Sequence, residues 1–102
     1  MEDKTDMIQP PHPGETIKED YLVPLGISVN RLAGVLGIGT ARLNEIVRGK
    51  RGITADTALR LARCFGTSAE FWLNLQALYD LRVTERKAGG KIKREVKPLK
   101  VA

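Results

Sequence analysis

The chain has 102 residues, of which 42% are hydrophobic, and a net charge of +5. This length supports one compact domain and leaves no room for a second core. No apolar run approaches the roughly 20 residues that a membrane helix needs, and acids stand where a signal peptide would begin with bases. The single cysteine, Cys64, excludes an internal disulfide. Together these features predict one soluble domain in the cytoplasm.

The charge is unevenly distributed along the chain. Residues 1–20 sum to −4, residues 42–51 to +3 and residues 89–102 to +4. This asymmetry is typical of a chain that meets an anionic partner at its middle and its tail. A solvated surface that keeps the chain soluble is the alternative interpretation of the charge alone.

Helical spacing of apolar residues, interrupted by Gly, Ser and Thr, predicts an all-α fold of five helices. The first helix runs from about Gly14 to Val23, because Pro13 suits a helix start while Pro24 and Gly26 suit a helix end.

The second helix follows Ser28, a good N-cap residue, and the third runs from about Thr40 to Arg48. A basic loop, residues 49–52, comes after the third helix. The side chains predicted to face the core are Leu32, Val35 and Leu36 in the second helix and Leu43, Ile46 and Val47 in the third.

The fourth helix is expected from Thr54 to Phe65, with apolar residues at the i, i+3, i+4, i+7 spacing of a core-facing helix. The fifth begins at Thr67 or Ser68, where residues 67–70 have the pattern of a capping box, and continues to about Lys87, where Gly89 and Gly90 would end it. A short strand and a disordered segment both remain open for the residues beyond. The chain therefore divides into an N-terminal arm (1–10), a helical domain (11–88) and a basic C-terminal tail (89–102).

The second and third helices have the pattern of a helix-turn-helix. Ala33 is a small residue where the two helices would cross, and Gly37 stands where the turn needs a positive φ. The apolar residues that would pin the pair onto the core are Leu32, Leu36, Ile38, Leu43 and Ile46. Seven matches at the right spacing favour this motif over an ordinary helical hairpin with a solvated polar face.

The polar side of the third helix is the predicted DNA-recognition surface. Asn44 can pair with adenine through two hydrogen bonds, and the bases of the following loop can hold phosphates. Glu45 either accepts from cytosine or holds Arg42 or Arg48 in place. The predicted DNA-binding residues are Ser28, Gly39, Thr40, Ala41, Arg42, Asn44, Glu45, Arg48, Lys50 and Arg51.

Four stretches of the chain resemble the HigA/VapI antitoxins, small members of the Xre/Cro-repressor-like class. They are His12-Pro13-Gly14-Glu15, Gly49-Lys50-Arg51-Gly52-Ile53-Thr54, Ala58-Leu59-Arg60-Leu61-Ala62 and Phe71-Trp72-Leu73-Asn74-Leu75-Gln76. The resemblance implies a five-helix λ-repressor-like fold and a homodimer on palindromic double-stranded operator DNA. It also implies neutralisation of a HigB-type toxin, an mRNA-cleaving ribonuclease, and repression of the shared operon. Gly39 departs from the pattern, since similar proteins usually have a polar cap there.

The fifth helix has two apolar faces. Phe71, Trp72, Leu75, Leu78 and Tyr79 form one face, and Leu73, Ala77 and Leu81 form the other. A domain this small can bury one face against its own core, with Trp72 inside, so the second face predicts a homodimer. Two-fold symmetry would then place the recognition helices roughly 34 Å apart. Burial of both faces within one monomer is the alternative.

No residue pattern predicts catalysis, a metal, a cofactor or a small-molecule ligand. His12 is interpreted as a residue at a helix start and Cys64 as a half-buried filler, since neither has further metal ligands in sequence reach. Three hypotheses remain: a DNA-binding repressor that is also an antitoxin, a toxin-binding module without DNA, and a stand-alone transcription regulator.

Overall fold

The computed structural model describes residues 9–100, and the regular structure in this range is helical, without a strand. The elements are α1 (Pro13–Ile17), a π-helical turn η2 (Lys18–Leu22), α2 (Val23–Leu25), α3 (Val29–Leu36), α4 (Thr40–Val47), α5 (Ala55–Phe65) and α6 (Ala69–Glu95). Because α1, η2 and α2 follow one another without a break, these segments form the five helices that the sequence predicts. Most of the predicted N-terminal arm lies outside the described residues.

The first helix is longer than predicted. It passes through Pro24 and ends at Leu25, where Gly26 adopts a left-handed φ of 64°. The turn before the proline is π-helical, so that the Val23 N–H donates to the carbonyl of Lys18, five residues earlier. The prediction that Pro24 ends this helix is therefore wrong, whereas the role of Gly26 is confirmed.

Three hydroxyl side chains fix the starts of the later helices. Ser28 Oγ accepts the N–H of Arg31 at 3.1 Å, and Thr54 Oγ1 accepts that of Thr57 at 3.3 Å. Ser68 Oγ accepts the N–H of Phe71 at 3.0 Å. Each bond satisfies a backbone donor that a helix start leaves without a partner. The predicted N-caps Ser28 and Thr54 are thereby confirmed, and of Thr67 and Ser68 it is Ser68 that caps α6, so the capping box of Thr67 with Glu70 is not formed.

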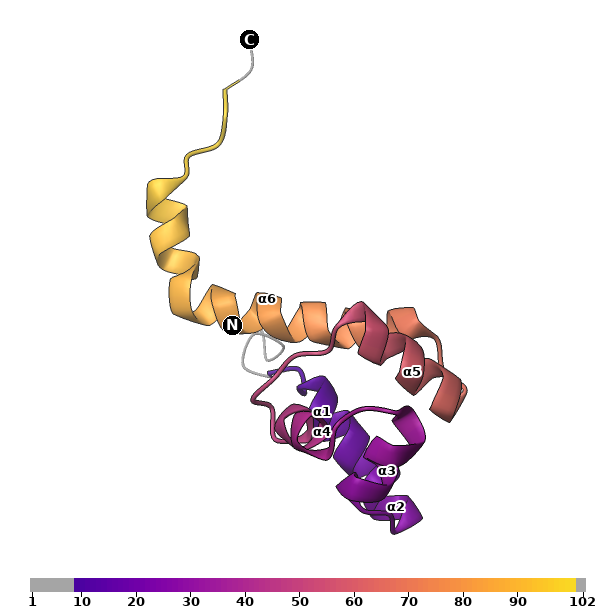
Figure 1. The fold of residues 1–102 in the computed structure, drawn as a ribbon. Coiled ribbons are helices and arrows are strands. Elements are labelled where there is room, and N and C mark those ends of the chain that lie inside the picture. Colours follow the sequence, from indigo (N-terminus) through magenta and orange to yellow (C-terminus); the bar gives the residue numbers. More distant parts are fainter. Residues whose placement is uncertain (1–8, 101–102) are drawn as a thin grey trace.

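The core lies between the α1–α4 bundle and the pair α5 and α6 (Figure 1). Its fully buried large side chains come from five helices and include Ile17, Leu32, Leu43, Ile46, Leu61 and Trp72. Trp72 Nε1 donates to Thr67 Oγ1 at 2.7 Å, which provides the acceptor that a buried indole needs. Tyr21 stacks on Phe65 with ring centroids 3.8 Å apart, closing the core beside the tryptophan.

Four residues that were predicted to be at least partly buried are exposed. Phe71 and Leu78, from the face of the fifth helix expected to meet the core, are 40% and 41% exposed, so only part of that face packs inward. Val35 is 63% exposed, because the buried face of α3 is centred between Leu36 and Ala33 and Val35 lies on the opposite side of the helix. Cys64 is also exposed, near the end of α5. The assignment of Val35 to the apolar stripe and of Cys64 to a half-buried position is therefore wrong.

Helix α6 continues well beyond the bundle. It passes through Gly89 and Gly90 to Glu95, so the prediction that the glycines end it is wrong. Both alternatives for residues 91–95, a strand and a disordered segment, are wrong as well. Figure 1 shows this distal part leaving the other helices and bending away from them. The radius of gyration is 17.0 Å, whereas a compact chain of 100 residues has about 13 Å. Despite its length, α6 lacks the apolar character of a membrane span, as does every other helix within residues 9–100.

Candidate nucleic-acid interface

The turn between α3 and α4 has the geometry that the sequence predicts. Gly37 adopts a φ of 74° at the end of α3, and its N–H donates to the carbonyl of Ala33 at 2.9 Å. Ala33 is buried where the two helices meet. A side chain from α5 supports this turn, since Arg60 Nη1 donates to the carbonyl of Leu36 at 2.9 Å. Arg60 is itself held by Asp56 at 2.6 Å.

Helix α4 is anchored by its inner face. Leu43 and Ile46 are completely buried, so the opposite side of the helix must face outward. The start of α1 crosses the end of α4 at Gly14, where the side-chain carbon that an alanine would add lies 1.8 Å from the carbonyl oxygen of Ile46. Only glycine allows so close a crossing, which fixes the position of the last turn of α4.

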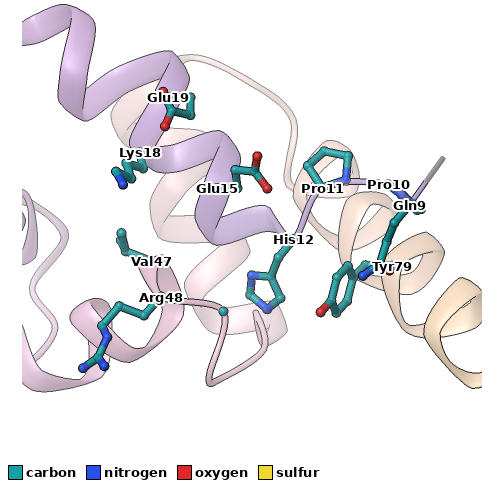
Figure 2. A pocket seen from close by; sticks show the side chains of 11 residues that line it. Gln9, Pro10, Pro11, His12, Glu15, Lys18, Glu19, Val47, Arg48 and Tyr79 are labelled. Atoms are coloured by element: carbon teal, nitrogen blue, oxygen red, sulfur yellow. The ribbon is translucent and has the colours of Figure 1, made fainter.

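Nine of the ten predicted DNA-binding residues are exposed. They are Ser28, Gly39, Thr40, Ala41, Asn44, Glu45, Arg48, Lys50 and Arg51. Figure 2 shows the side chain of Arg48 extending freely from the end of α4. The first turn of α4 is tied to α3, because the Thr40 hydroxyl donates to Asn30 Oδ1 at 2.7 Å. This face is therefore an accessible polar surface whose first turn is bonded to α3.

Gly39 leaves the start of this surface open. It is the N-cap residue of α4, with extended backbone and without a side-chain hydrogen bond to the helix. Within residues 9–100, no atom lies within 4 Å of the side-chain carbon that an alanine would add there. Gly39 thus adds no side-chain bulk at the start of α4.

Arg42 does not lie on the exposed surface, contrary to its prediction as a DNA contact. Its Nη2 lies 3.4 Å from the hydroxyls of both Thr54 and Thr57, at the start of α5. Its Nε is buried and has no hydrogen-bond partner within the described residues. Arg42 stands at the border between the inner and outer faces of α4, and its long side chain reaches inward. The structure thus assigns it to the packing of α4 on α5.

Glu45 pairs with a residue that the sequence did not suggest. Its Oε1 lies 3.0 Å from Nε of Arg51, whereas the expected partners were Arg42 and Arg48. Both side chains are about half exposed, so the pair contributes little to stability. Its consequence is positional, since it connects α4 to the basic loop that follows.

Comparison with known proteins matches this geometry to a family. The helix-turn-helix family model covers residues 17–72, from the first helix to the start of α6. Virulence-associated protein I of Dichelobacter nodosus is 56% identical over 75 residues, which are 74% of this chain and 69% of that protein. This chain belongs to the HigA/VapI group of helix-turn-helix proteins.

Solved structures agree with this assignment. An addiction module antidote protein of the HigA family from Coxiella burnetii is 50% identical, with a TM-score of 0.85 over 90% of this chain and 100% of that one. The antitoxin HigA of Pseudomonas aeruginosa, solved with the higBA promoter, is 44% identical, with a TM-score of 0.85 over 89% and 99% of the two chains. The resemblance to HigA/VapI antitoxins and the predicted fold class are thereby confirmed.

One further residue supports the basic loop, and sequence patterns missed it. Gln76 of α6 accepts the N–H of Ile53 through Oε1 at 2.7 Å and donates to Asp80 through Nε2 at 2.9 Å. Its amide also lies against Gly52, in the basic loop. Gln76 therefore clamps this loop onto α6, although helical periodicity shows it only as a polar residue between two apolar faces.

A polar cleft of about 930 Å³ adjoins the end of α4 in this HigA/VapI member (Figure 2). At its base His12 caps α1, with Nδ1 accepting the N–H of Gly14 at 2.9 Å. The ring meets Tyr79 edge-on, with centroids 5.0 Å apart. Burial lowers the pKa of His12 although Asp80 and Glu15 act to raise it. The interpretation of His12 as a helix-start residue is confirmed.

Proposed function

We propose that this HigA/VapI member is a cytoplasmic repressor that binds operator DNA and is also the antitoxin of a HigB-type, mRNA-cleaving ribonuclease. The observation that carries the proposal is the exposed polar face of α4, whose opposite face is buried in the core. The relative from Pseudomonas aeruginosa, solved with the higBA promoter, supports operator binding and repression of the chain's own operon. The function consists of binding, without catalysis and without a cofactor.

In this proposal α4 enters the major groove, as the second helix of the motif does in its class. Asn44 bonds the edge of an adenine, while Thr40 and Ala41 contact a thymine methyl or a phosphate. Arg48 reaches guanine or the backbone. The positioning contacts to phosphate come from Ser28 with the start of α3, from the open start of α4 at Gly39, and from Lys50 and Arg51. Glu45 acts by orienting Arg51.

A base-substitution series tests this role of α4. The affinity of Asn44→Ala and of the parent is measured by fluorescence anisotropy on promoter duplexes in which each A·T pair of the operator is replaced in turn. We expect the variant to lose discrimination at one A·T position in each half-site, by about 5- to 150-fold, and to keep it elsewhere. The other positions serve as the internal control. Unchanged discrimination at every position would remove Asn44 from the base contacts.

The toxin partner is tested by co-expression with the product of the adjacent gene. We expect the two proteins to co-purify and the RNA cleavage of the partner to disappear in the complex. A neighbouring product that neither cleaves RNA nor binds this chain would favour the stand-alone regulator. Co-purification without promoter binding would favour the toxin-binding module.

The proposed homodimer uses the outward face of α6. Of the three predicted interface residues, Ala77 and Leu81 are exposed, with Leu81 at 52%, whereas Leu73 is half-buried and packs against the core. Leu78, 41% exposed, lies beside them. We therefore expect Leu81→Glu to sediment as a monomer and to bind the promoter more weakly. A dimer that persists in Leu81→Glu would move the interface elsewhere.

A further inference from the structure

The positive charge of this chain is concentrated on its last helix. Residues 81–100 hold eight bases and two acids, a net charge of +6, while residues 1–80 sum to −1. The chain as a whole carries +5, so its entire excess of positive charge lies in this distal segment, residues 81–100. The segment begins where α6 leaves the bundle and ends beyond the last turn of the helix (Figure 1).

The helical face that packs on the core becomes basic in the distal segment. Trp72 is buried and Tyr79 and Val83 are half-buried on the inner side of α6. At about 100° per residue, the same side of the helix continues as Arg86, Gly90, Lys93 and Arg94. The core no longer lies beneath these positions, and residues 90–100 are all exposed. The helix thus exchanges an apolar face for a cationic one where it loses its packing partner.

Within residues 9–100, ion pairs hold two of these bases, and a third, Arg86, donates to Gln9 Oε1 at 2.6 Å. Arg82 lies 2.9 Å from Glu85, and Lys91 lies 3.8 Å from Glu95. The remaining bases that make no ion pair within residues 9–100 are Lys87, Lys93, Arg94, Lys97 and Lys100. Clustered like charges repel one another along a helix, and a polyanion would relieve this repulsion.

We propose that the distal segment is a second DNA-binding surface, which holds the phosphate backbone of duplex DNA without reading sequence. Lys87, Lys91 and Arg94, spaced i, i+4 and i+7, form one row of bases along the helix, and Lys93 lies beside this row. A duplex carries one charge per about 1.7 Å of its axis, so several phosphates face such a row at once. An anionic membrane fits less well, because the outward apolar side of the segment is interrupted by Gly89.

This surface is separate from the α4 surface. The distal segment bends away from the bundle that contains α3 and α4 (Figure 1). The family model ends at residue 72, so the segment also lies outside the matched helix-turn-helix. The inference rests on the proposed function only in taking DNA as the polyanion. It predicts that the segment adds affinity for any duplex and leaves the preference for the operator unchanged.

The test compares two full-length variants whose net charge is in each case lowered by two. Lys93→Gln/Arg94→Gln alters the distal segment, and Arg63→Glu alters one exposed base on α5, away from the α4 surface. Anisotropy is measured with a 40-base-pair duplex that lacks the operator, from 50 to 200 mM salt. If both distal bases contact phosphate, the slope of log K against log salt falls by about 1.8. Between 50 and 200 mM salt the distal variant then loses affinity by a factor about 12 times smaller than the parent does, while Arg63→Glu keeps the parental slope.

Equal slopes for the distal variant and the parent would overturn the proposal, as would an equal fall in both variants. Sedimentation with phosphatidylserine vesicles is the second probe. Vesicle binding that depends on Lys93 and Arg94, with unchanged duplex binding, would assign the segment to lipid and also overturn it. A failure of α4 to bind the operator remains distinguishable, because it removes the operator preference and leaves the salt slope on the non-operator duplex.

Discussion

The crossing of α1 over α4 gives a prediction with a magnitude taken directly from the structure. Replacing Gly14 by alanine would place a carbon 1.8 Å from the carbonyl oxygen of Ile46 and 2.9 Å from Cα of Val47. Real contacts of this kind are no shorter than 3.0 Å, so α1 would have to move from α4 by about 1.2 Å. Both obstacles are backbone atoms and cannot rotate away. Overpacking of this kind costs about 1–3 kcal/mol.

For a domain of this size, such a loss lowers the melting temperature by about 4–24 °C. We expect the fall for Gly14→Ala to lie in the upper part of this range. The melting temperatures of variant and parent are compared at equal protein concentration by thermal denaturation followed with circular dichroism. Operator affinity should fall as well, since the displaced turn of α4 carries Arg48.

Gly34→Ala is the matched control for this measurement. Gly34 lies inside α3, and an alanine side chain there would meet no other part of residues 9–100 within 4 Å, apart from the helix's own backbone. The same substitution should therefore stabilise the chain there, by about 0.4–1 kcal/mol. Gly14→Ala melting within 2 °C of the parent would refute the close crossing of α1 and α4.

Three further predictions concern the loop clamp, the start of α1 and the core. Gln76→Leu removes the acceptor of the Ile53 N–H, so urea denaturation should show a loss of about 1–3 kcal/mol, and an unchanged midpoint would argue against the clamp. Since burial lowers the pKa of His12 below its ordinary value of 6.5, the unfolded chain binds the proton more readily. The contribution of His12 to the free energy of unfolding should therefore be complete above pH 6.5 and decline as the pH falls below it. His12→Asn keeps a capping side chain and should lose this decline, whereas identical pH profiles of stability for the variant and the parent would contradict the reasoning. Trp72→Phe and Thr67→Val should show a coupling of about 0.5–1.5 kcal/mol in a double-mutant cycle, whereas additive effects would mean that their hydrogen bond is not formed.

The parts of the fold that the sequence predicted correctly depend on local chemistry. Ser28, Thr54 and Ser68 start their helices through hydrogen bonds that span three residues, and such bonds are visible in sequence spacing. The turn at Gly37 likewise depends on one residue that tolerates a positive φ. Burial of Leu43 and Ile46 then leaves only one side of α4 for recognition.

The parts that the sequence did not predict depend on contacts between distant residues. Arg42 turns inward because Thr54 and Thr57 offer it oxygens from another helix, and periodicity does not contain this information. Gln76 reaches the basic loop across 23 positions of the sequence.

The extension of α6 was missed for a different reason. Gly89 and Gly90 each weaken a helix by about 1 kcal/mol relative to alanine, which favours a helix end at this point. Lysine, arginine and glutamate in the turns around them are good helix formers, and Lys91 and Glu95 make an i, i+4 pair. The favourable neighbours outweigh the two glycines.

The operator affinity of the double variant Arg48→Glu/Lys50→Glu tests the central claim most directly. Both residues are exposed at the end of α4 and in the loop after it, so charge reversal leaves the core intact and circular dichroism should match the parent. We predict that anisotropy on the promoter duplex shows no operator binding by this variant, while Arg63→Glu on α5 binds as the parent does. Parental operator affinity in the folded double variant would contradict the assignment of this face to DNA.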